Sequence, residues 1–158
     1  MLLEIDRMNW RIVNDTVMGG VSTSEFEIDG GTLLFRGRLS TENRGGFVSV
    51  LGRLKEPLVN VAGFELECSG DARRYQFRLR ESDETREIAW RAFFNSQRQV
   101  SRTSLAIEKF HPVKRGQPVF AAKPLELVPV NFIGFMLTSR RPGPFELRVH
   151  SLKALMAP

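Results

Sequence analysis

Few side chains in this sequence have the type and spacing needed for catalysis. Its two histidines are His111, which precedes a proline, and His150, near the C-terminal end. No G-x-S-x-G, H-E-x-x-H or Walker sequence accompanies them, and a Ser-His-Asp arrangement would have to assemble from distant segments. Acidic residues gather in ESDETRE, residues 81–87, which has the composition of a solvated hairpin loop. We therefore predict a protein that is not an enzyme and uses no cofactor.

The stretch NDTVMGGVS, residues 14–22, concentrates polar and glycine residues. Asn14 and Asp15 can accept backbone N–H groups, while Gly19 and Gly20 permit positive φ or a close backbone approach. The glycine pair lacks the spacing of a dinucleotide-binding loop, and one acid with one amide is too few ligands for a metal. We predict a self-bonded turn, with Asn14 and Asp15 bonded mainly to backbone groups and Met18 packed inward. The stretch is also a candidate binding site, formed by Asn14, Asp15, Met18, Gly19, Gly20 and Ser22.

A second candidate site is an arginine-rich face of two predicted strands. In RRYQFRLRES and EIAWRAFFNS, apolar residues alternate with arginine, amide and aromatic residues. Forked arginine donors beside an aromatic ring can hold carboxylates, sugars or phosphates. The alternative is an ordinary solvated face covered by long arginine stems. The candidate residues are Gln76, Arg78, Arg80, Arg91, Phe93 and Asn95, and we expect Arg36 and Arg38 from a third strand to join them.

Strands must position these side chains, because the dominant hydrophobic period is two. Alternating segments recur along the chain, separated by turn sequences such as DGG (29–31), NRGG (43–46) and RPGP (141–144). Many short strands of this kind predict one all-β domain over residues 1–158, a jelly-roll β-sandwich. Helical turns are expected only near residues 6–10 and 54–58. Residues 105–128, with three prolines, predict a long connection with an Arg-Gly turn at residues 115–116.

The chain of 158 residues carries a formal charge of +5, and its positive side chains are dispersed. This charge suits an acidic protein surface or anionic lipid, while its dispersed pattern argues against nucleic acid as the main partner. Cys68 is the only cysteine, which excludes an intramolecular disulfide and a cysteine-based zinc site. No run approaches the ~18 apolar residues of a transmembrane segment. With no export signal at its start, the chain is predicted to be cytoplasmic.

Four motifs occur in a characteristic order along the chain. They are W-x-x-x-N-D-x-V-M-G-G-x-S (10–22), LLFRGRLSTENRGGFVSV (33–50), FHPVKRGQPV (110–119) and NFIGFMLTSRRPGPFELRVHSLKAL (131–155). Together they resemble the CIA30 domain family, that of complex I intermediate-associated protein 30, over about residues 7–155. The resemblance implies a galactose-binding-like β-sandwich, a jelly roll shared with many carbohydrate-binding modules. It also implies a chaperone-like role, because mitochondrial members bind subassemblies of respiratory complex I without catalysing a reaction.

The resemblance therefore suggests a protein partner, with respiratory complex subunits as the candidates. This chain looks like a stand-alone, bacterial-type member, so complex I assembly does not follow from the fold alone. The alternative is a carbohydrate-binding module, in which Phe93 would be the platform and neighbouring amides and arginines the donors. Trp90 alternates onto the opposite, buried side of its strand and is not expected to contribute.

Overall fold

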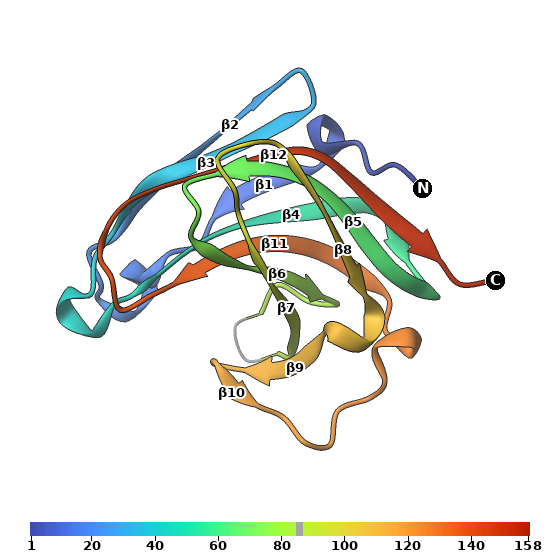
Figure 1. The fold of residues 1–158 in the computed structure, drawn as a ribbon. Helices are drawn as coiled ribbons and strands as arrows, with labels where there is room; N and C mark the ends of the chain where they lie inside the picture. Colours follow the sequence, from blue (N-terminus) through green and yellow to red (C-terminus); the bar gives the residue numbers. More distant parts are fainter. Residues whose placement is uncertain (85–86) are drawn as a thin grey trace.

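Two antiparallel sheets account for the alternating pattern of the sequence (Figure 1). The structure, a computed structural model, describes residues 1–84 and 87–158. One sheet has seven strands in the order β1-β4-β11-β6-β7-β9-β10, and the other has five in the order β2-β3-β12-β5-β8. The prediction of an all-β sandwich of jelly-roll type is confirmed.

The seven-stranded sheet runs from top to bottom of Figure 1 in its pairing order. Its strands are β1 (Asn9–Ile12), β4 (Phe47–Leu58), β11 (Val130–Thr138), β6 (Arg74–Arg80), β7 (Ala89–Asn95), β9 (His111–Lys114) and β10 (Gln117–Pro118). The five-stranded sheet consists of β2 (Thr23–Asp29), β3 (Thr32–Leu39), β12 (Gly143–Met156), β5 (Val61–Gly70) and β8 (Ser101–Ala106). Short 3-10 turns connect them: η1 (Ile5–Arg7), η2 (Asp15–Met18), η3 (Glu42–Arg44), η4 (Ile107–Lys109) and η5 (Leu125–Leu127).

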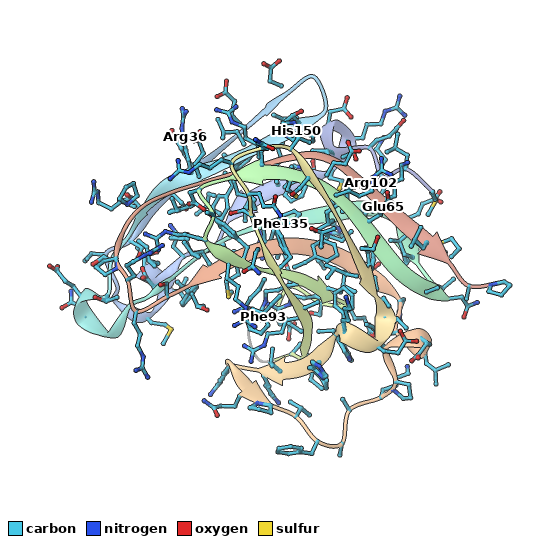
Figure 2. The ribbon with its side chains drawn as sticks, in the orientation of Figure 1. Arg36, Glu65, Phe93, Arg102, Phe135 and His150 are labelled. Atoms are coloured by element: carbon cyan, nitrogen blue, oxygen red, sulfur yellow. The ribbon has the colours of Figure 1, made fainter. Side chains whose placement is uncertain are left out.

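Aromatic side chains fill the space between the sheets. Phe64 of β5 packs edge-on against Phe77 of β6, with ring centroids 5.0 Å apart, and Phe77 lies 5.3 Å from Phe135 of β11. Figure 2 shows Phe135 between the two sheets. Trp90 is buried on the core side of β7, as the alternation predicts. Because the core takes every second residue of β6 and β7, the residues between them must face outward.

Three local predictions need correction. The helical turn expected near residues 6–10 ends at Arg7 as η1, and residues 9 and 10 belong to β1. Residues 54–58 are the end of β4 rather than a helical turn, because Leu58 pairs with Val130 of β11 and cross-strand bonding overrides the local preference. Residues 105–128 contain more strand than the long connection predicted. The Arg-Gly turn is confirmed: Arg115 and Gly116 have φ values of 51° and 79° and join β9 to β10.

The predicted loop at residues 81–87 includes residues 85 and 86, which lie outside the described part of the chain. At its start, the Arg80 guanidinium donates to the carbonyl of Ser82 at 2.9 Å and to that of Glu84. Asp83 accepts a hydrogen bond from Arg11 of β1 at 3.2 Å, so this acid is ion-paired and not only solvated. Among the described residues, no helix has the length and apolar character needed to cross a bilayer.

Candidate functional site

Asp15 is a buried carboxylate that ties the first predicted site to the start of β4. Its Oδ2 accepts hydrogen bonds from the Ser22 hydroxyl at 2.6 Å and from the backbone N–H groups of Gly46 at 2.8 Å and Phe47 at 3.3 Å. Its Oδ1 accepts the backbone N–H of Ser22 at 3.1 Å. Asp15 therefore bonds mainly to backbone groups, as predicted, but its partners include residues more than thirty positions away.

These hydrogen bonds also set the ionisation of Asp15. Burial raises the pKa of the Asp15 carboxyl, and the hydrogen bonds from Ser22, Gly46 and Phe47 lower it. The hydrogen bonds outweigh burial, so the pKa of Asp15 lies below its ordinary value of 3.8. The charged carboxylate is thus the form that the fold stabilises.

Two glycines allow the chain to close around this carboxylate. A Cβ atom on Gly20 would lie 2.5 Å from Cγ of Asp15, and one on Gly45 would lie 2.6 Å from its Oδ2. Both distances are shorter than real Cβ atoms tolerate, so the close approach requires glycine. Gly19 ends η2 in the left-handed region, with a φ of 86°. The glycine pair at residues 19–20 and the pair at residues 45–46 therefore serve one structural unit around Asp15.

Asn14 and Met18 depart from the predicted turn. Asn14 Oδ1 accepts the Ser24 hydroxyl at 2.9 Å and the backbone N–H of Ser49 at 3.3 Å, so only one of these partners is a backbone group. Met18 is 65% exposed, and the prediction that it packs inward is wrong. The reason is that η2 is a single turn whose Asp15 side faces the protein, which leaves its other side in solvent.

Ser22 completes the same unit. Its hydroxyl donates to Asp15 and accepts the backbone N–H of Ser40, at the end of β3, at 2.9 Å. The polar groups of Asn14, Asp15 and Ser22 are thus used within the fold. This geometry favours a structural role for residues 14–22 over ligand binding.

The second predicted site forms on the outer side of the seven-stranded sheet. In the register of β6 and β7, Arg78 lies opposite Arg91, and Gln76 lies opposite Phe93. Tyr75, Phe77 and Leu79 of β6 are buried in the core, so the residues alternating with them share the outer side. We call this surface the arginine face, and it consists of Arg74, Gln76, Arg78, Arg91, Phe93 and Asn95, of which Gln76 is buried beneath its neighbours at 2% exposure.

Arg78 lies at the centre of the arginine face without an acidic partner. Its Nη1 donates to Oε1 of Gln76 at 2.7 Å, and Gln76 Nε2 donates to Oγ1 of Thr138 at 3.1 Å. Burial, together with the like charges of Arg80 and Arg91, lowers the pKa of Arg78 to about 10. Among the described residues, no carboxylate lies within ion-pair distance of Arg78 or Arg91. The face therefore holds positive charge that the protein does not neutralise.

Phe93 is surrounded by guanidinium groups. The Arg74 Cζ lies 3.8 Å from the Phe93 ring centroid, and the Arg91 Cζ lies 5.1 Å from it. The ring is 39% exposed and orients both arginines through cation–π contacts. Arg74 was not among the predicted residues, although it lies one alternation before Gln76. His111 of β9, opposite Arg91, borders the same face and could have been found only from the strand pairing.

Arg36 does not join the arginine face. It belongs to β3 in the five-stranded sheet, and Figure 2 shows Arg36 and Phe93 on opposite sides of the sandwich. Its Nε donates to Oε1 of Glu25 at 2.7 Å, and this hydrogen bond raises the pKa of Arg36. Arg38 lies on the same strand. The alternating pattern was correct for β3, but alternation does not specify which sheet a strand enters.

The outer side of the five-stranded sheet differs in its electrostatics. Arg102 pairs with Glu65 at 2.8 Å, and Arg148 pairs with Glu146 at 3.0 Å. On this side, the charges of Arg36, Arg102 and Arg148 are matched by acids within the fold. Three arginines on this side are thus ion-paired, whereas Arg78 and Arg91 on the other side, within the described part of the chain, are not.

The histidines offer little catalytic geometry. Oγ of Ser69 and Nε2 of His150 lie 2.9 Å apart on the five-stranded sheet. Among the hydrogen bonds of the described residues, none joins the His150 ring to a carboxylate that would complete a triad. The described residues also contain no group of three His, Cys, Asp or Glu side chains placed to hold a metal ion.

Comparison with solved structures shows the fold class. The structure resembles the family 11 carbohydrate-binding module of the cellulosomal cellulase Lic26A-Cel5E of Clostridium thermocellum, with a TM-score of 0.73 and 13% identity over 99% of this chain and 94% of that one. A family 11 carbohydrate-binding module from Clostridium thermocellum in complex with a β-1,3-1,4-mixed-linked tetrasaccharide has a TM-score of 0.70 and 13% identity, over 99% of this chain and 95% of that one. A mutant family 29 carbohydrate-binding module has a TM-score of 0.52 and 9% identity, over 95% of this chain and 94% of that one. At these identities the likeness establishes a shared β-sandwich fold.

Comparison by sequence gives the family. No significant match was found among curated proteins. The family described as complex I intermediate-associated protein 30 (CIA30) matches residues 4–149, which is most of the chain. This match covers all four motifs identified in the sequence except the last residues of the fourth. The chain belongs to the CIA30 family.

Proposed function

We propose that this protein is a non-catalytic binding module that holds an acidic protein partner on its arginine face, as an assembly factor for a respiratory complex. The observation that supports this most directly is the unneutralised charge of Arg78 and Arg91. Arg36, Arg102 and Arg148 of the opposite sheet have acidic partners within the fold, whereas Arg78 and Arg91 have none in the described part of the chain. A partner that supplies carboxylates would complete the arrangement.

Carboxylates suit this site for an energetic reason. The lowered pKa of Arg78 means that its charged form is less stable here than in water. A carboxylate beside it would accept forked, charge-assisted hydrogen bonds and remove the like-charge repulsion from Arg80 and Arg91. Phe93 holds Arg74 and Arg91 through cation–π contacts, so less side-chain freedom is lost on binding.

Family membership supports a protein as the source of those carboxylates. The family name describes association with an intermediate of complex I. An assembly factor must bind its partner reversibly, and charge-based recognition provides fast association with moderate affinity. A respiratory subassembly with an acidic patch is therefore the partner that we propose for the arginine face.

A carbohydrate ligand is the second candidate. It is favoured by the similar fold of a module that was solved with a mixed-linked tetrasaccharide. A sugar ring stacks on an aromatic face, but the Arg74 guanidinium lies 3.8 Å from the ring centroid of Phe93. A neutral sugar would have to displace this guanidinium, whereas an anion would bind to it directly. The geometry thus favours an acidic partner over a neutral glycan.

A tagged pull-down from the native cell tests the proposal. The wild-type protein is expected to capture respiratory complex I subunits under gentle conditions. The double variant Arg78→Gln/Arg91→Gln should lose at least about tenfold in capture, because charged interface contacts are each worth more than 1.4 kcal/mol when desolvated. The matched control Arg36→Gln/Arg148→Gln removes the same charge from the other sheet and should capture normally.

Two results would contradict the proposal. One is unchanged capture by the Arg78→Gln/Arg91→Gln variant. The other is normal complex I in a deletion strain, together with no respiratory subunits in the wild-type pull-down. A titration with mixed-linked β-1,3-1,4-glucan distinguishes the second candidate. Binding that is lost in Phe93→Ala and kept in Arg36→Gln/Arg148→Gln would support the carbohydrate function instead.

A further inference from the structure

The segment between Glu108 and Glu126 contains basic residues and no acidic ones. Its sequence, KFHPVKRGQPVFAAKPL, includes Lys109, Lys114, Arg115 and Lys123. On the five-stranded sheet, by contrast, Arg36 pairs with an acidic neighbour, Glu25. This acid-free stretch covers β9, β10 and the connection to η5, and the arginine face uses none of its residues apart from the bordering His111.

The fold presents part of this segment at the periphery of the protein. β9 and β10 form the last hairpin of the seven-stranded sheet, with Lys114 paired to Gln117. The left-handed Arg115 and Gly116 form its two-residue turn, which places the Arg115 side chain at the hairpin tip. In Figure 1 the chain after β10 forms the lowest part of the molecule, far from both termini.

Phe120 lies in this peripheral chain and is almost wholly exposed. Its side chain is 97% exposed, against 65% for Val17 and Met18, the next most exposed large hydrophobic residues in the described chain. The residues that precede Phe120 line a shallow hollow of about 590 Å³. They are Lys114, Arg115, Gln117, Pro118 and Val119. Single exposed apolar side chains are common on protein surfaces, but a phenyl ring as exposed as that of Phe120 would gain free energy by leaving water.

We propose that this segment, which we call the basic loop (residues 114–123), binds the surface of an anionic membrane. Phe120 would insert into the boundary between headgroups and acyl chains, and Lys114 with Arg115 would hold a lipid phosphate at the hollow. Basic side chains flanking an exposed aromatic residue are the combination that peripheral membrane binding uses.

A membrane fits the basic loop better than a protein partner does. Protein interfaces concentrate their binding energy in clustered apolar side chains that pack into pockets. Phe120 is instead a single large apolar side chain, followed by two alanines and flanked by basic residues. A lipid surface needs no shape complementarity, and its negative charge matches every ionised side chain of the loop.

Vesicle sedimentation with the full chain tests this proposal. The wild-type protein should sediment with vesicles of equal parts phosphatidylcholine and phosphatidylserine, and much less with phosphatidylcholine alone. Binding should fall as salt is added, because the charges are exposed. Phe120→Ser should weaken the apparent affinity at least about tenfold, since burying a phenylalanine side chain is worth about that factor or more. Lys114→Gln/Arg115→Gln should weaken it by a similar factor.

Matched variants separate this site from general effects. Val100→Ser removes another large exposed apolar side chain outside the basic loop, and Lys55→Gln/Lys153→Gln removes two charges elsewhere. Both should bind vesicles as the wild type does, and thermal melting should show that all variants are folded. The Arg78→Gln/Arg91→Gln variant should also keep vesicle binding, so failure of either proposal leaves the other standing.

Two outcomes would overturn the membrane proposal. The first is no sedimentation of the wild-type protein with anionic vesicles. The second is equal binding by the wild type and by folded Phe120→Ser. If that variant also no longer captures respiratory subunits, the basic loop is assigned to a protein partner instead.

Discussion

Replacement of Asp15 by asparagine isolates the role of the most recognisable motif in the chain. The substitution keeps the shape of the side chain but removes its charge and one acceptor oxygen. In the folded protein, the carboxylate accepts four hydrogen bonds, three from backbone N–H groups and one from the Ser22 hydroxyl. If residues 14–22 have a structural role, Asp15→Asn should destabilise the fold strongly.

The expected loss can be worked out from these contacts. The amide oxygen can replace Oδ2, which receives three of the donors, but the NH₂ group then faces the backbone N–H of Ser22. One buried donor is left without an acceptor, at a cost of about 1–3 kcal/mol, and the other bonds lose their charge assistance. A neutral asparagine costs less free energy to bury than a charged aspartate, and this difference offsets part of the loss. We expect a net loss of about 3 kcal/mol in the free energy of unfolding, or roughly 6–12 °C in Tm.

Urea denaturation followed by tryptophan fluorescence provides the assay, because Trp90 is buried and reports on the core. The measurement should be repeated at lower pH. The folded-state pKa of Asp15 lies below its ordinary value of 3.8, so its stabilising contribution is complete above about pH 4 and disappears as the pH falls through the folded-state pKa. The difference between wild type and Asp15→Asn should therefore shrink at acidic pH.

Asp29→Asn is the matched control for this substitution. Asp29 ends β2 at an exposed hairpin turn, so the same chemical change there should alter stability by no more than about 0.5 kcal/mol. An Asp15→Asn variant as stable as this control would refute the structural interpretation. Wild-type stability combined with loss of partner capture would instead assign residues 14–22 to the binding site.

Three further predictions concern single residues. Gly45→Ala should cost about 2 kcal/mol in urea denaturation, because its Cβ would meet Oδ2 of Asp15 at 2.6 Å; unchanged stability would show that Asp15 can move away. Arg78→Gln should raise the free energy of unfolding by about 1 kcal/mol while reducing partner capture, since it removes a charge whose pKa is lowered to about 10; a less stable variant would contradict this. Burial raises the pKa of the Cys68 thiol to about 12, so this cysteine should react with Ellman's reagent only after unfolding, and rapid reaction of the native protein would be inconsistent with its buried position.

The sequence alone determined which side of the alternating strands β6 and β7 faces the core. In β6 and β7, alternation correctly assigned Phe77 and Trp90 to the interior and Arg78, Arg91 and Phe93 to the outside. This works because side chains of an extended backbone point alternately to its two faces, so the pattern is local. The order of several separate motifs likewise sufficed to indicate the family, and that indication is confirmed over residues 4–149.

Only the tertiary structure decided which distant residues meet. Arg36 was grouped with Arg78 on the basis of similar local patterns, but sheet assignment depends on non-local strand pairing and separates the two residues. Asp15 was expected to bond within its own turn, yet Gly46 and Phe47 supply half of its hydrogen bonds. The exposure of Met18 and Phe120 followed from the same cause: a side chain outside regular strands is buried only if another part of the fold covers it, and no local pattern encodes that.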